Sequence, residues 1–90
     1  MVQAIRISET GGPEVMMLEE VRLDAPGSGM VTVENRAIGL NYIDTYHRSG
    51  LYPLPLPTGI GLEGAGVVQA VGEGVTLAEG DRVAYCSAGF

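Results

Sequence analysis

The sequence contains no lysine, a single cysteine and a single histidine. Without lysine, no side chain of this chain can form a Schiff base or act as a lysine general base. A lone cysteine cannot form an internal disulfide bond, and by itself it cannot hold zinc, which fits a reducing compartment. We therefore expect a cytoplasmic protein in which Cys86 is a small residue of a strand.

Positive charge and long apolar runs are also scarce. Five arginines stand against eleven acidic residues, and the formal net charge is -6, so there is no basic patch that could follow a phosphate backbone. No apolar run is long enough to cross a bilayer, and the starting residues MVQAIRISE lack the charged and apolar regions of a signal peptide. We expect no nucleic-acid partner and no membrane partner.

The size and composition allow one core at most. The chain has 90 residues, of which 46% are hydrophobic and 18% are charged. The charged fraction is below the quarter that is usual for globular proteins, which indicates that some of the surface is covered by another part of the protein or by a partner. We therefore treat residues 1–90 as one domain or as part of one.

Short segments with strand character, separated by Gly and Pro turns, make up most of the chain. Val31 and Val33 alternate with Thr32 and Glu34, which is the pattern of a half-buried strand. The expected strands cover residues 2–8, 16–23, 30–36, 66–71 and 81–86. The sequence therefore predicts a mainly β fold, either a small barrel or a sandwich.

One short helix is predicted between Asn41 and Gly50. Asn41 is a good N-cap, Asp44 is an acid of the first turn, and Gly50 stands where a left-handed C-terminal cap belongs. Asp44 can be explained by the helix dipole alone, and His47 is expected to be a solvated helix residue. Because prolines alternate with leucines over residues 53–57, an extended loop follows the helix.

Residues 59–64 match the dinucleotide-binding pattern G-x-G-x-x-G, but their surroundings exclude that function. The pattern binds a pyrophosphate only where it follows a strand and opens a helix. Here a proline-rich loop precedes Gly59, and the β-branched, glycine-rich residues 65–68 follow Gly64. We expect these glycines to allow tight turns and close packing before a strand.

Three blocks in order resemble one protein family. They are GGPEV at residues 11–15, AIGLNYIDTY with RSGLYP at residues 37–46 and 48–53, and GLEGAGVV through GDRV at residues 61–68 and 80–83. Together they resemble the quinone oxidoreductase branch of the medium-chain dehydrogenase/reductase superfamily. The resemblance implies a GroES-like, partly open β-barrel with one short helix. Residues 1–90 would be the N-terminal part of that substrate domain, and the Rossmann cofactor domain would lie outside them.

The resemblance also implies the chemistry of the site. Zinc-dependent relatives have a Cys at the position of Asn41 and a His at that of Leu62, and because leucine cannot bind zinc we expect no metal site. NADPH is then the implied cofactor, and it reduces a quinone or enone. The implied cofactor-binding residues are Asn41, Tyr42, Ile43, Asp44, Thr45 and Tyr46. Tyr46 and Tyr52 are the candidate catalytic residues, because either hydroxyl could donate a hydrogen bond to the quinone oxygen.

Each of these assignments has a plainer alternative. The tyrosines could be amphipathic residues with solvated hydroxyls, and Asn41 could serve only as a helix cap, although capping and binding can hold together. For the whole chain, the alternative is a non-catalytic GroES-like binding or oligomerisation module, followed by a zinc alcohol dehydrogenase. The family resemblance further implies a homodimer of the full-length protein.

Overall fold

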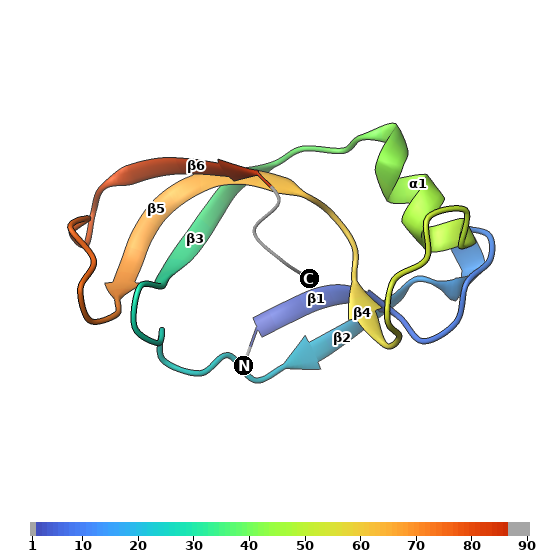
Figure 1. Cartoon of the computed structure of the whole chain (residues 1–90), viewed down its shortest axis with the longest axis horizontal. Coiled ribbons are helices and arrows are strands. Elements are labelled where there is room, and N and C mark those ends of the chain that lie inside the picture. The colour runs from blue at the N-terminus through green and yellow to red at the C-terminus, as the bar shows by residue number, and fades with distance from the viewer. Residues whose placement is uncertain (1, 87–90) are drawn as a thin grey trace. The chain divides into compact units, whose positions relative to one another are not determined.

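The computed structural model describes residues 2–86, and its elements are mostly short strands (Figure 1). In chain order they are β1 (Val2–Ile7), the 3-10 helix η1 (Pro13–Val15), β2 (Met17–Val21), β3 (Val31–Ile38), α1 (Tyr42–Ser49), β4 (Thr58–Gly59), β5 (Glu63–Val71) and β6 (Arg82–Cys86). The mainly β fold with one short helix is therefore confirmed. No helix within residues 2–86 is long and apolar enough to cross a membrane.

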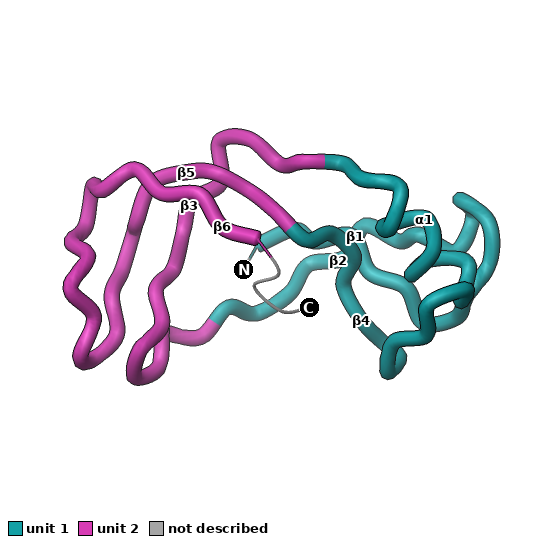
Figure 2. Tube along the Cα trace, turned by 45° about the horizontal axis from the view of Figure 1, so that its top comes forward, with its two compact units in different colours: residues 1–23, 40–62, 89–90 teal, residues 24–39, 63–88 magenta. Residues whose placement is uncertain are grey.

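The chain divides into two compact units, which Figure 2 colours separately. Of the described residues, 2–23 and 40–62 form unit 1, and 24–39 and 63–86 form unit 2. Each unit contains one three-stranded sheet. The division places the helix α1 and the proline-rich loop in unit 1, within one excursion of the chain between β3 and β5.

The sheet of unit 1 has the order β2-β1-β4 (Figure 1). Strands β1 and β2 pair in antiparallel fashion from Val2 opposite Val21 to Arg6 opposite Met17, so the two predicted strands form a hairpin. The short strand β4 pairs with the end of β1, where Ile7 lies opposite Thr58. The side chains of Ile7 and Thr58 are almost fully buried, so the end of β1 forms part of the core of this unit.

The sheet of unit 2 has the order β3-β5-β6, and all its neighbours are antiparallel. The central strand β5 pairs with β3 from Val31 opposite Val71 to Ile38 opposite Gly64, and the register shifts twice, between Thr32 and Val33 and between Asn35 and Ala37. Val68 is 2% exposed, and its central position explains this burial. From Glu63 to Val68, buried and less buried residues alternate along β5, as expected for an antiparallel sheet with one covered face.

Two short elements and several strand boundaries differ from the sequence-based expectations. Strand β2 covers Met17–Val21 rather than residues 16–23, and β3 ends at Ile38 rather than at residue 36. The 3-10 helix η1 and the two-residue strand β4 were not predicted, because neither carries a periodic apolar pattern. Strand β5 begins at Glu63 rather than at residue 66. Gly64 is the third glycine of the G-x-G-x-x-G match, and it lies inside β5. The expectation that a strand rather than a helix follows this pattern is therefore confirmed.

Candidate functional site

The helix α1 begins with a reciprocal cap between Asn41 and Asp44. Asn41 has an extended backbone conformation, with φ -127° and ψ 156°, as an N-cap residue requires. Its backbone N–H donates to Oδ2 of Asp44 at 2.9 Å, and the N–H of Asp44 donates to the carbonyl oxygen of Asn41 at 3.0 Å. This is a capping box, in which the third helical residue reaches back to the cap. The predicted start of the helix is confirmed.

The other end of the helix is fixed by Gly50 and Arg48. Gly50 has φ 89° and its N–H donates to the carbonyl oxygen of Tyr46 at 3.1 Å, so it is the predicted left-handed cap. The N–H of Gly11 donates to the carbonyl oxygen of Arg48 at 2.9 Å, and Nε of Arg48 donates to the carbonyl oxygen of Gly11 at 3.2 Å. Both ends of α1 are therefore held by specific hydrogen bonds within unit 1.

The buried face of α1 contains two titratable residues. Asp44 is 5% exposed and His47 is 8% exposed, although both stand in a two-turn helix of a small unit. The expectation that His47 is a solvated helix residue is therefore wrong. Because residues three apart lie on the same helix face, the packing that buries Asp44 buries His47 as well. Oδ1 of Asp44 is buried and has no hydrogen-bond partner among the residues that the structure describes.

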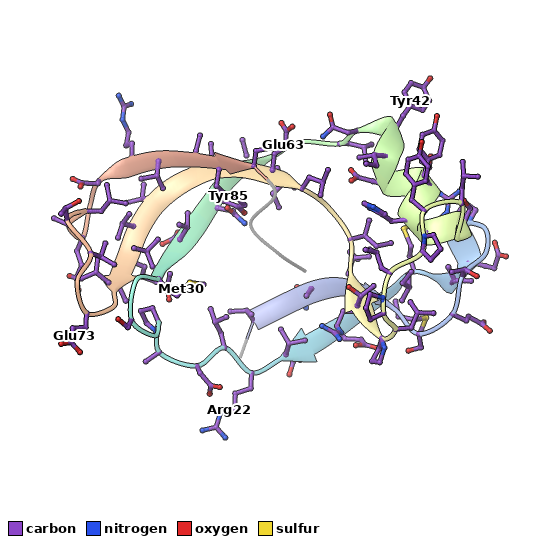
Figure 3. All side chains as sticks on the ribbon, in the orientation of Figure 1. Arg22, Met30, Tyr42, Glu63, Glu73 and Tyr85 are labelled. Atoms are coloured by element: carbon purple, nitrogen blue, oxygen red, sulfur yellow. The ribbon has the colours of Figure 1, made fainter. Side chains whose placement is uncertain are left out.

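The opposite face of α1 presents its tyrosines. Tyr42 is 83% exposed and Tyr46 is 36% exposed, and Figure 3 shows the Tyr42 side chain directed away from the helix. The ring of Tyr52 meets that of Tyr46 edge to face, with the centroids 5.4 Å apart, and its backbone N–H donates to the carbonyl oxygen of Tyr46 at 3.3 Å. The structure therefore brings the two candidate catalytic tyrosines together and leaves both rings accessible.

The remaining candidate residues lie between these two faces. Ile43 and Thr45 are half-buried. The hydroxyl of Thr45 donates to the carbonyl oxygen of Tyr42 at 2.6 Å, so this donor is already used within the helix. Of the six residues expected to bind a cofactor, Asn41, Tyr42 and Tyr46 offer exposed side chains, whereas Asp44 does not.

Leu62 is half-buried and immediately precedes β5. Its side chain carries no atom that could bind a metal. Within residues 2–86, no group of three or more His, Cys, Asp or Glu side chains is arranged to hold a metal ion.

An open hollow of about 530 Å³ in unit 2, formed by β3, β5 and β6, was not predicted from the sequence. It is lined mainly by small and apolar residues, with Glu63, Tyr85 and Cys86 as its larger polar members. A hydrogen bond of 2.9 Å from the Tyr85 hydroxyl to Oδ1 of Asn35 lies beside it. The alternate glycines at positions 64 and 66 were the available signal, because strand glycines often mark a close approach of other groups.

Residues 27–89 match the protein family described as the alcohol dehydrogenase GroES-like domain. The chain is 55% identical over 89 residues to a quinone oxidoreductase of Pseudomonas aeruginosa and 51% identical over 87 residues to quinone oxidoreductase 1 of Escherichia coli. These matches cover 97% and 94% of this chain, but the chain spans only 27% of the length of either relative.

Solved structures give the same picture. The crystal structure of Escherichia coli quinone oxidoreductase complexed with NADPH matches with a TM-score of 0.92 at 49% identity, over 96% of this chain and 27% of that one. A cobalt- and zinc-bound alcohol dehydrogenase from Pyrobaculum aerophilum matches with a TM-score of 0.84 at 34% identity, over 91% and 25% of the two chains. The fold, the capped helix and the family match agree, and the chain belongs to the alcohol dehydrogenase GroES-like domain family.

Proposed function

We propose that this chain is the substrate-domain segment of a zinc-independent, NADPH-dependent oxidoreductase that reduces a quinone or an enone. The main support for this proposal is the exposed face of α1 that carries Tyr42 and Tyr46, next to Tyr52. The relatives of the chain are quinone oxidoreductases. A helix that served only the fold would not need Tyr42 and Tyr46 exposed on one side. A binding surface needs them there, because an aromatic ring contributes both a large apolar face and a polar tip.

The residues at the start of α1 fit a cofactor such as NADPH. The side chains of Asn41, Tyr42 and Tyr46 are exposed and combine an amide with two phenol rings. An amide can donate and accept hydrogen bonds, and an aromatic ring can lie against a nicotinamide. When bound, NADPH supplies the hydride for the reaction. Ile43 and Thr45 contribute to the shape of this surface, and the buried Asp44 supports it from behind.

Tyr46 and Tyr52 are the residues that we assign to the substrate. As hydride reaches a quinone or enone, negative charge develops on the carbonyl oxygen, and a hydroxyl that donates to that oxygen stabilises the transition state. The edge-to-face contact between the two rings fixes their mutual orientation at a centroid distance of 5.4 Å. Each ring then needs less ordering when the substrate binds.

Zinc independence is part of the proposal and rests on side-chain chemistry. A catalytic zinc needs three protein ligands with nitrogen, sulfur or oxygen donors. The zinc enzymes that the chain resembles use positions that are Asn41 and Leu62 here, and leucine has no donor atom. A substrate that is already electrophilic does not require the polarisation that a metal would provide.

The proposal for the rest of the protein follows from the family resemblance and, for its compartment, from the single cysteine. The Rossmann domain lies outside residues 1–90, the intact protein is a cytoplasmic homodimer, and residues 1–90 alone have no activity. The alternative, a non-catalytic GroES-like module, gives no role to the exposed tyrosine face.

The decisive experiment measures NADPH oxidation by the intact protein that contains this chain, with 1,4-benzoquinone and an α,β-unsaturated ketone as acceptors. We expect turnover with at least one acceptor and none with residues 1–90 alone. Absence of turnover with both acceptors, in a protein that assembles into rings, would favour the binding module. Activity that requires stoichiometric zinc would favour an alcohol dehydrogenase.

A further inference from the structure

The buried carboxylate of Asp44 stands out among the residues of α1. Its side chain is 5% exposed, and Oδ2 accepts the backbone N–H of Asn41 at 2.9 Å. Its other oxygen, Oδ1, is buried and has no hydrogen-bond partner among the described residues. A buried carboxylate oxygen without a partner is unfavourable for folding, so its presence requires an explanation.

Helix capping alone does not explain this arrangement. The capping oxygen of a helix start is usually near the surface, where water satisfies the second oxygen. In α1 the acceptor is instead enclosed on the same face as His47, while Asn41 on the other side of the hydrogen bond is exposed. The hydrogen bond therefore joins the exposed Asn41 to the buried carboxylate of Asp44 in unit 1.

The carboxylate of Asp44 helps to set the backbone conformation of Asn41. Two hydrogen bonds join Asn41 and Asp44, one in each direction, and they hold Asn41 at φ -127° and ψ 156°. An extended residue at the end of a loop would otherwise sample several conformations, and ordering it on binding would weaken the affinity for a ligand. A buried acceptor is less exposed to competition from water than a surface one.

We propose that Asp44 is a positioning residue that fixes Asn41 in the conformation that binds NADPH. This inference rests on the proposed function and assigns Asp44 an indirect role, in place of direct contact with the cofactor. It predicts an effect on NADPH binding that is larger than the effect on the chemical step, because Asn41 would stabilise bound NADPH equally in the ground state and in the transition state.

The test compares Asp44→Ala, Asp44→Asn and Arg48→Met in the intact protein. Arg48 is a matched control, because its Nε makes one hydrogen bond at the opposite end of the same helix. We expect Asp44→Ala to raise the Kd for NADPH about tenfold and to change kcat at saturating NADPH by less than about twofold. Asp44→Asn should restore most of the affinity, since an amide oxygen can accept the N–H of Asn41. Arg48→Met should leave the Kd within about twofold of the wild-type value.

Three results would overturn the inference. They are an unchanged Kd in Asp44→Ala, an equal rise in Kd in Asp44→Ala and Arg48→Met with equal loss of thermal stability, and a failure of Asp44→Asn to restore binding. If Asp44→Ala does not fold, Asp44→Ser replaces it, because a serine hydroxyl is too short to reach the acceptor position, and the same Kd comparison applies.

Failure of the proposed function gives a different pattern. A wild-type protein that binds NADPH but reduces neither acceptor contradicts the proposed reaction, while the Kd series still decides the role of Asp44. A wild-type protein that does not bind NADPH contradicts both. Fluorescence titration with NADPH gives the Kd without any turnover.

Discussion

The hydroxyl of Tyr85 on β6 donates a 2.9 Å hydrogen bond to Oδ1 of Asn35 on β3, across the central strand β5. The bond passes over Gly64, where an added Cβ would lie 2.5 Å from the Tyr85 hydroxyl oxygen and 3.0 Å from Oδ1 of Asn35. Gly66 on the same strand faces a stricter limit, because its added Cβ would meet the backbone carbonyl oxygen of Glu34. Gly64 thus leaves room for the hydrogen bond between Tyr85 and Asn35, and Gly66 allows the backbone of β3 to lie close to β5.

These contacts predict a graded loss of stability in unit 2. Gly66→Ala should lower the free energy of unfolding by about 3 kcal/mol, because backbone must move to make room. Gly64→Ala should lower it by about 1 kcal/mol, because the end of the Tyr85 side chain can swing away and lose its hydrogen bond. Gly27→Ala is the control, since an added Cβ there meets nothing within 4 Å. Urea denaturation measures all three, and equal effects at positions 64 and 66 would contradict the prediction.

The left-handed glycine at the end of α1 allows a second comparison. Gly50 has φ 89° and Gly74 has φ 79°, so alanine is strained at both positions. Only at Gly50 would the new Cβ also approach another group, at 3.1 Å from Cγ2 of Thr10. We expect Gly50→Ala to lower the free energy of unfolding by about 1 kcal/mol more than Gly74→Ala does, as measured by urea denaturation. Equal losses at the two positions would show that Thr10 moves aside without cost and would contradict the prediction.

The tyrosine hydroxyls provide the most direct test of the catalytic assignment. Tyr46→Phe and Tyr52→Phe keep the ring contact and remove one hydroxyl each, so the fold should be unaffected. We expect at least one of them to lower kcat for quinone reduction about tenfold or more. Tyr85→Phe is the control, because it removes a hydroxyl that serves the sheet of unit 2. If both active-site variants kept full turnover and substrate affinity, neither hydroxyl would act on the substrate.

Metal removal tests zinc independence. With asparagine at position 41 and leucine at position 62, we expect dialysis of the intact protein against a strong chelator to leave NADPH oxidation unchanged. A known zinc alcohol dehydrogenase, treated in the same way, should lose its activity. Loss of turnover that returns when zinc is added would reverse this part of the proposal.

The sequence predicted the fold well where local patterns determine it. The strand β3 and the helix caps Asn41 and Gly50 were predicted from residues close in the chain, and the structure confirms them, although Val31, Thr32 and Val33 are all half-buried. The start of β5 was placed three residues late, since Gly64 and Ala65 have low strand propensity and pair with β3 and β6 only in the folded sheet. Long-range pairing decided this boundary.

The candidate site was predicted in part. The shared face of Tyr42 and Tyr46 follows from helical spacing alone. The burial of Asp44 and His47 depends on tertiary packing in unit 1, and the contact between Tyr46 and Tyr52 depends on the path of the chain after Gly50. Neither could be derived from the order of residues. The binding and catalytic roles of these side chains stay predictions.

The junction between Gly39 and Glu63 has a consequence for how this protein can change. The N–H of Gly39 donates to the carbonyl oxygen of Glu63 at 3.4 Å, and the Glu63 side chain lies so close to Gly39 that a Cβ there would collide with it. The chain thus leaves the sheet of unit 2 at Gly39 and returns to it at Glu63, and this hydrogen bond joins the two ends of the segment formed by residues 40–62. Substitutions within residues 40–62 can therefore accumulate while the register between β3 and β5 stays the same.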